Sequence, residues 1–265
     1  MATLDIGRTF SRMSSLVGSS FASVGVFVLG VHVVTTGLQF FINRQMIGAM
    51  AGIAPTPGNP LAGLAVFSSG WYWASLVIAM ALGGFSMAGG IGGMLRIARG
   101  EATSVADCVA IGAGKLLPVL GFSILWGLAI GLGSMLLVVP GLILLTMWSA
   151  GLPALVAGDT GVFGAFGRSR ALTRGSRWRI FAVLLIMLIV IYVVMFVVLG
   201  AVGFSMMPKP GTPVNATMLA ASSPLVMLGS MVVGTLSVLV IDALLVSIYT
   251  ELDDGSGGRL ANVFS

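Results

Sequence analysis

Five arginines lie close together between two long apolar segments of the chain. They are Arg168, Arg170, Arg174, Arg177 and Arg179. Residues 116–157 contain no charged side chain, and residues 180–204 form the most apolar segment of the sequence. Positive charge of this density crosses a bilayer only at a high free-energy cost, so the arginines are expected to stay on one side. The pattern predicts membrane-spanning segments on both sides of the arginines.

The composition of the whole chain indicates the same class of protein. Hydrophobic residues make up 57% of the 265 residues, charged residues only 8%, and the mean hydropathy is +1.10. About a quarter of the residues in a soluble domain are charged, which keeps its surface hydrated. This chain has far fewer, so most of its surface must face hydrocarbon. We therefore expect an all-α integral membrane protein with a single polytopic membrane domain over residues 1–265.

Six apolar segments have the length and composition of membrane spans. They cover residues 17–41, 71–95, 116–139, 142–157, 180–204 and 224–249. The dipeptide Pro140–Gly141 predicts the tight turn between the third and fourth spans. The fourth span is short and contains Pro153, which leaves open whether it crosses fully or is re-entrant.

A weak internal repeat groups these six spans in pairs. Each pair is preceded by a short segment with the pattern of a helix on the membrane surface. These segments are residues 4–13, 103–114 and 162–174. We therefore predict six transmembrane helices as three helical hairpins, each preceded by a short cytoplasmic surface helix. The tail after residue 249 is polar and is expected to be extended.

The basic residues fall unevenly on the two sides of this six-span arrangement. Two of the thirteen, Arg44 and Lys209, lie in the long external loops predicted over residues 43–70 and 205–223. The other eleven lie on the side of the arginine stretch: Arg8, Arg12, Arg96, Arg99, Lys115, the five arginines above and Arg259. By the positive-inside rule, both termini are expected to be cytoplasmic.

Signatures of catalysis and of metal binding are absent from the sequence. It contains no Walker glycine loop, no HExxH motif and no GxSxG motif. Cys108 is its only cysteine and His32 its only histidine, which excludes an internal disulfide and a zinc site built from these ligands. We expect no enzyme, no cofactor and no metal. An enzyme acting on lipid would need acids from distant segments to converge, such as Asp107, Asp159, Asp242 and Glu251.

Two ionisable residues lie inside predicted spans. Asp242 falls in the last span, about two turns from its cytoplasmic end, and His32 lies in the middle of the first. Ionisable groups at membrane depth are costly and mark functional sites, so a proton or ion relay is one interpretation. The alternative is structural: Asp242 accepts hydrogen bonds or pairs with an arginine, and His32 is a neutral hydrogen-bonded residue.

The arginine stretch also has two interpretations. Arg168, Arg170, Arg174, Arg177 and Arg179 bind a lipid headgroup in the first, since arginine holds phosphate with two parallel hydrogen bonds. In the second they only orient the protein in the membrane. The net charge of +5 lies beside apolar spans with no nucleic-acid-binding motif, so the expected partner is anionic lipid rather than nucleic acid.

Residues 137–181 resemble a group of bacterial inner-membrane proteins. This segment contains a VPGLIL turn, the dipeptide MW, an RS pair and the run LTRG-RW-IF, and the chain ends in YTELDDGSGGRLANVFS. The group includes YciC-like proteins and the membrane domain attached to some glycerophosphoryl diester phosphodiesterases. The resemblance implies location in the bacterial inner membrane. It supplies no catalytic residue, because the phosphodiesterase domain has no counterpart in this sequence.

Two functions follow from these observations. The first is a non-enzymatic inner-membrane protein with a membrane-organising or accessory role, which contacts anionic headgroups of the cytoplasmic leaflet or a partner membrane protein. The alternative is a small transporter or permease with Asp242 in its pathway.

Overall fold

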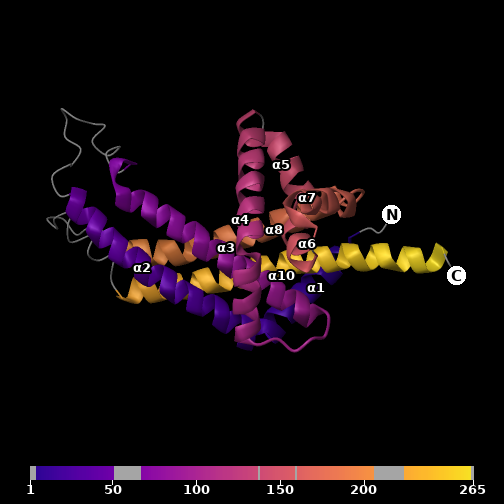
Figure 1. The fold of residues 1–265 in the computed structure, drawn as a ribbon, viewed down its shortest axis with the longest axis horizontal. Helices are drawn as coiled ribbons and strands as arrows, with labels where there is room; N and C mark the ends of the chain where they lie inside the picture. The colour runs from indigo at the N-terminus through magenta and orange to yellow at the C-terminus, as the bar shows by residue number, and fades with distance from the viewer. Residues whose placement is uncertain (1–3, 51–66, 137, 159, 206–223, 264–265) are drawn as a thin grey trace.

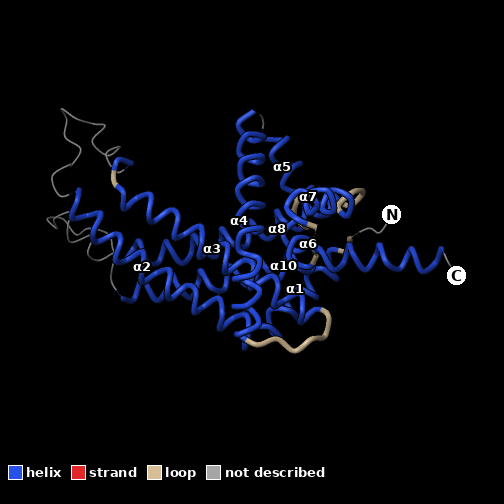
Figure 2. Tube along the Cα trace, viewed as in Figure 1, coloured by secondary structure: helices blue, strands red, loops and turns tan. Residues whose placement is uncertain are grey.

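The computed structural model describes residues 4–50, 67–136, 138–158, 160–205 and 224–263. These residues form helices and short connections, and no strand occurs among them (Figure 2). Six helical segments are long and apolar enough to cross a membrane: Ile6–Ile42, Gly70–Ala98, Val105–Leu136, Val139–Ala157, Arg177–Val197 and Leu228–Asp254. The prediction of an all-α membrane protein with six such helices is confirmed. Most of the two predicted external loops, residues 51–66 and 206–223, lies outside the described residues.

The first three elements form one continuous helical run. Helix α1 (Ile6–Ser20) leads through a π-helical turn, η1 (Phe21–Gly25), into α2 (Val26–Met50). The direction of the chain changes around η1, as is common where a π turn interrupts an α-helix (Figure 1). The segment predicted as a separate surface helix, residues 4–13, is therefore the start of the same run as the first span.

Helix α3 (Gly70–Ala98) matches the second predicted span closely. It ends at Ala98, and Gly100 just beyond it has a φ of +79°, which lets the Glu101 N–H donate back to the Arg96 carbonyl at 2.9 Å. The next helix, α4 (Val105–Leu136), joins the predicted surface helix 103–114 and the third span in one element. Pro118 lies inside α4 without ending it, because a proline removes a single intrahelical hydrogen bond and the adjoining turns keep theirs.

The prediction of a turn at Pro140–Gly141 was wrong. Helix α5 (Val138–Met147) includes both residues, so neither of them lies in a turn. Proline is tolerated in a first helical turn because the N–H groups there have no intrahelical partner. The fourth predicted span is divided, since α6 (Gly151–Ala157) follows α5 only after a turn at residues 148–150.

Three helices complete the described chain. Helix α7 (Gly161–Leu172) covers most of the third predicted surface helix, and α8 (Arg177–Ser205) covers the fifth span. Helix α10 (Pro224–Val263) continues well past residue 249, so the prediction of an extended tail was wrong. Ion pairs from α1 and α7 reach the turn of α10 just beyond that residue, which stabilises it as helix.

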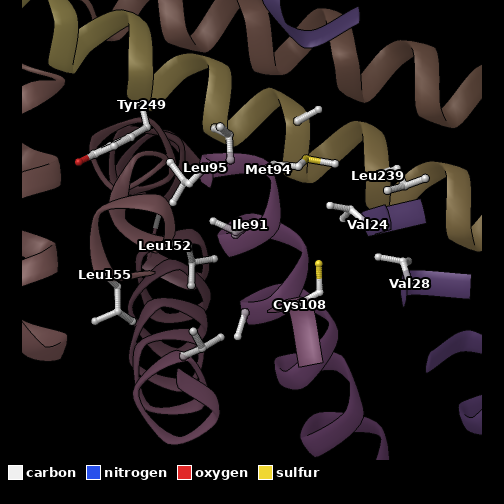
Figure 3. Close-up of a cluster of buried hydrophobic side chains, with 14 of the residues drawn as sticks. Val24, Val28, Ile91, Met94, Leu95, Cys108, Leu152, Leu155, Leu239 and Tyr249 are labelled. Carbon is white, nitrogen blue, oxygen red and sulfur yellow. The ribbon is translucent and has the colours of Figure 1, made fainter. Parts of the chain in front are cut away.

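Helices α2, α3, α8 and α10 run along the long axis of the molecule, and α4 is steeply inclined to them (Figure 1). The most extensive packing joins α3 to α4, across the boundary between two predicted hairpins. The three-hairpin grouping therefore stays a prediction. The main core contains apolar side chains of α3, α4, α6 and α10 and of the N-terminal run (Figure 3). Those labelled there are Val24, Val28, Ile91, Met94, Leu95, Cys108, Leu152, Leu155, Leu239 and Tyr249.

Candidate functional site

The side chain of Asp242 is buried in the interface between α10 and α3. Its exposed fraction is 1%, and its Oδ2 atom has no hydrogen-bond partner within the described ranges. Oδ2 lies against Gly90 of α3 so closely that a Cβ atom at Gly90 would overlap it. Because glycine has no side chain, the α3 backbone itself forms the wall beside the carboxylate.

Two hydroxyl groups nearby in the same helices are also buried without a hydrogen-bond partner among the described residues. They are Ser86 Oγ on α3 and Thr235 Oγ1 on α10. Ser86 precedes Gly90 by four residues and Thr235 precedes Asp242 by seven, spacings that place each pair on one helix face. The facing sides of α3 and α10 thus carry three polar side chains, each with an oxygen that no described residue hydrogen-bonds, and sequence analysis had selected only Asp242.

His32 extends from α2 toward α10. Its Nδ1 atom lies 3.1 Å from the Val28 carbonyl, and a Cβ atom built on Gly234 of α10 would lie 3.1 Å from its Nε2 atom. His32 is therefore adjacent to the α10 residue that precedes Thr235. We call His32, Ser86, Gly90, Thr235 and Asp242 the polar seam. The two ionisable residues predicted from sequence both belong to it, and Gly90, Ser86 and Thr235 were missed.

The five arginines of the sequence cluster do not form one surface. Arg168 pairs with Asp253 at 3.2 Å and lies over the ring of Tyr249, with 5.6 Å from its Cζ atom to the ring centroid. Arg179 donates to the Leu4 carbonyl at 3.1 Å. The Nε atom of Arg177 is buried and has no hydrogen-bond partner in the described structure.

Arg170 and Arg174 differ from the other three. Both are exposed, and their side chains form no ion pair or hydrogen bond with the residues that the structure describes. Trp178, in the first turn of α8, is close to them in sequence and is 85% exposed. These two arginines are the members of the cluster that remain available to a ligand.

Two acidic residues that follow residue 249, Glu251 and Asp254, bind the N-terminal helix. Arg8 Nη2 lies 3.1 Å from Glu251, and Arg12 lies 3.7 Å from Glu251 and 2.9 Å from Asp254. The side chain of Glu251 is only 7% exposed. Sequence analysis missed this cluster, because no local pattern indicates that charges about 240 residues apart in the chain will meet.

A cavity of about 460 Å³ opens between α3, α4 and α6, and three cations line it. Arg96 is fixed by Glu101 at 3.1 Å and Asp107 at 3.2 Å. The Nζ atom of Lys115 donates to the Gly158 carbonyl at 3.4 Å. The third cation is Arg99, and apolar residues including Ile111 and Val156 form the rest of the wall.

No group of three or more His, Cys, Asp or Glu side chains within the described ranges is placed to hold a metal ion. Of the four acids that a lipid-acting enzyme would have to bring together, Asp159 lies outside the described residues. Asp107 pairs with Arg96 and Glu251 with Arg8, while Asp242 is in the polar seam. The described residues thus provide two kinds of chemical group: exposed cations, and a buried carboxyl group with an oxygen that no described residue hydrogen-bonds.

Six long apolar helices, with a buried polar seam and arginines beside their ends, define a helical membrane protein. Comparison with known families gives a match to the domain of unknown function DUF7847 over residues 110–252. The match covers more than half of the chain, so the chain belongs to that family. It includes the arginine stretch and Asp242, whereas His32 and Gly90 precede it. No curated protein and no solved structure matches the chain. The findings give no evidence for the YciC-like or phosphodiesterase membrane group, which stays a resemblance.

Proposed function

We propose that this protein is a non-enzymatic protein of the bacterial inner membrane that contacts anionic lipid headgroups, in an accessory or membrane-organising role. Both termini lie in the cytoplasm in this proposal, and a partner membrane protein is a further contact. The observation that carries it is the exposure of Arg170 and Arg174 without an ion pair or hydrogen bond from their side chains to any residue that the structure describes. A cation close to an anionic leaflet contributes about 1 kcal/mol of binding free energy.

Two further features support contact with anionic lipid. The exposed ring of Trp178 at the start of α8 is of the kind that lies at headgroup level. The cavity between α3, α4 and α6 combines cations with apolar walls, a lining that suits an anionic amphiphile. The ion pairs of Arg8 and Arg12 with the end of α10 hold the first and last helices at the same end of the molecule, as two cytoplasmic termini require.

The test is the retention of lipid by the purified full-length protein. Wild type and an R170Q/R174Q double variant would be mixed with vesicles containing phosphatidylglycerol or only phosphatidylcholine, and retained lipid measured by native mass spectrometry. We expect the double variant to bind phosphatidylglycerol roughly thirtyfold more weakly, the effect of losing about 2 kcal/mol. An Arg44→Gln variant, which removes an exposed cation from the far end of α2, is the matched control.

Equal retention by wild type and R170Q/R174Q would overturn the proposal. An R170K/R174K variant separates two forms of binding. Unchanged retention would indicate simple charge attraction, and reduced retention would indicate paired hydrogen bonds to phosphate.

A second function, a small transporter, is favoured by a different observation. Asp242 is buried among apolar helices with an unpaired oxygen, as expected of an ion-coupling residue. In proteoliposomes, an Asp242→Asn variant should lose ion-driven uptake of substrate while retaining phosphatidylglycerol. Full uptake by the variant would exclude this residue from transport.

A further inference from the structure

We infer that Asp242 is a proton-binding site inside the membrane, and that the proton bound there permits the close packing of α10 on α3. This inference goes beyond the contact with lipid. It rests in part on the transport alternative, for which it names the coupled ion. Its tests use the protein alone, so failure to find a transported substrate leaves them unaffected.

The surroundings of Asp242 favour the neutral form of its side chain over the ionised form. Its side chain is 1% exposed, and its Oδ2 atom accepts no hydrogen bond from the described residues. An ionised carboxylate taken from water into apolar surroundings without donors or a counter-charge loses most of its hydration free energy. The neutral acid avoids this loss, and one proton is enough to form it.

No positively charged group of the described residues lies in contact with the Asp242 carboxyl group. Among the described residues, α3 contributes Ser86 and Gly90 to the polar seam, and neither carries a charged side chain. On α2, His32 lies beside Gly234, about 12 Å from Asp242 along the α10 axis. Cys108 of α4 packs at Gly93, the next turn of α3, and Tyr249 of α10 lies about two turns beyond Asp242. None of these groups supplies a positive charge in contact with Oδ2.

The surroundings of Asp242 suit a bound proton and do not suit a metal cation. Hard cations require several oxygen ligands at about 2.3–2.6 Å. Thr235 precedes Asp242 by seven residues, or about 10 Å along α10, so the two side chains are too far apart to share one ion. The backbone of Gly90 fills the space on the Oδ2 side. A proton needs no such coordination shell.

The close packing of α10 on α3 depends on the proton bound at Asp242. A single methyl group at Gly90 would overlap Oδ2, so the shell of water that an ionised carboxylate needs cannot fit while the contact persists. Loss of the proton therefore requires α10 to move away from α3. Ser86, Thr235 and His32 continue the polar seam away from Asp242, and they would line the path along which water enters.

Infrared difference spectroscopy of the full chain in detergent at neutral pH tests the charge state. The C=O stretch of a protonated carboxyl group should be present in wild type and absent in Asp242→Asn, whereas all other acids are common to both proteins. Absence of this difference would show that Asp242 is ionised and would overturn the inference. Loss of the wild-type band on replacing choline chloride by sodium chloride at constant pH would also overturn it, in favour of a sodium site.

A pair of glycine variants on α3 tests the geometry. In Gly90→Ala the added methyl group displaces the carboxyl group toward water, and the protonated band should be lost or strongly reduced at neutral pH. In Gly83→Ala, where a Cβ atom meets nothing within 4 Å, the band should equal that of wild type. An undiminished band in correctly folded Gly90→Ala would contradict the assigned contact.

Hydrogen exchange tests the link to packing without depending on the fold of Gly90→Ala. Asparagine imitates the neutral acid and does not ionise, so Asp242→Asn should remain closed at alkaline pH. Wild type should instead show faster exchange in the facing turns of α3 and α10 as pH rises, after correction for the intrinsic pH dependence measured in Asp242→Asn. The same alkaline increase in both proteins would refute the coupling.

Discussion

The guanidinium group of Arg8 lies 3.1 Å from the carboxylate of Glu251, which joins the first helix of the chain to the last. The two partners have different surroundings, since the Glu251 side chain is 7% exposed and that of Arg8 is 67% exposed. Arg12 approaches the same carboxylate from the next turn of α1. Two exposed cations thus neutralise one buried anion, and together they attach α1 to α10.

Glu251→Gln should lower the stability of the folded protein by about 1–2 kcal/mol, because it removes the charge that both arginines share. The measurement is thermal unfolding in detergent, followed by the exposure of buried Cys108. Asp254→Asn is the control, since Asp254 is 66% exposed and its pair with Arg12 should contribute at most about 1 kcal/mol. Equal effects of the two substitutions would show that burial of Glu251 does not strengthen its ion pairs.

Gly112→Ala should destabilise the contact between α3 and α4 by about 1–3 kcal/mol. A Cβ atom at Gly112 would lie 2.9 Å from the ring of Phe85 and 3.0 Å from its backbone carbonyl, and the backbone atom cannot rotate away. Gly114→Ala, two residues further along α4, meets nothing within 4 Å and should be neutral or stabilising. Thermal unfolding of both variants measures the difference, and a tolerant Gly112→Ala would contradict the close approach of the two helices.

The end of α5 is stabilised by hydroxyl groups of α7 and of Thr173, the residue that follows it. Ser169 Oγ donates to the Met147 carbonyl at 2.9 Å, and Thr173 Oγ1 lies 3.1 Å from the same oxygen. Met147 is the last residue of α5, so its carbonyl has no partner within that helix. S169A/T173V should therefore cost about 1–3 kcal/mol, more than the sum of the single variants. Additive single effects would show that the two hydroxyls act independently. Ser14→Ala, at an exposed site, is the control.

Acid should loosen the first turn of α1. The backbone N–H of Arg8 donates to Asp5 at 2.9 Å, and this hydrogen bond holds the pKa of the Asp5 carboxyl below its ordinary value. A lowered folded-state pKa gives stability that is present above the unfolded pKa of about 4 and is lost as pH falls through the folded value. Hydrogen exchange at the start of α1 should accelerate over that acid range in wild type. In Asp5→Asn, which keeps an acceptor but does not titrate, the acid-induced acceleration should disappear.

Hydropathy was sufficient to predict the long helices, because burial of apolar side chains in lipid depends on local composition. Helix α8 is the clearest case, since residues 177–205 contain the predicted span 180–204. The turn at Pro140–Gly141 was predicted wrongly because the same dipeptide suits both a turn and a first helical turn. Continuation of α10 beyond residue 249 depends on ion pairs with Arg12 and Arg168, which local sequence does not reveal.

The polar seam was only partly predictable for a related reason. Asp242 and His32 are conspicuous because ionisable residues are rare in apolar spans. Nothing in the local sequence of α3 indicated that Gly90 would contact a residue about 150 positions away. The unpaired hydroxyl groups of Ser86 and Thr235 could not be predicted, since hydroxyl groups in membrane helices usually form hydrogen bonds with the backbone of their own helix. Their unpaired state is visible only once α3 and α10 are placed together.

Helix α10 contains 40 residues and is therefore about 60 Å long, roughly twice the thickness of the hydrocarbon layer. Val263, at its end, lies about 30 Å along the axis from Asp242. If α10 tilts as a rigid rod by about 10° about its ion pairs at Glu251, Asp242 moves about 2 Å away from α3 and Val263 moves on the order of 3 Å in the opposite direction. Loss of one proton at Asp242, at membrane depth, would thus displace the distant end of α10. A molecule bound to that end would respond to the displacement.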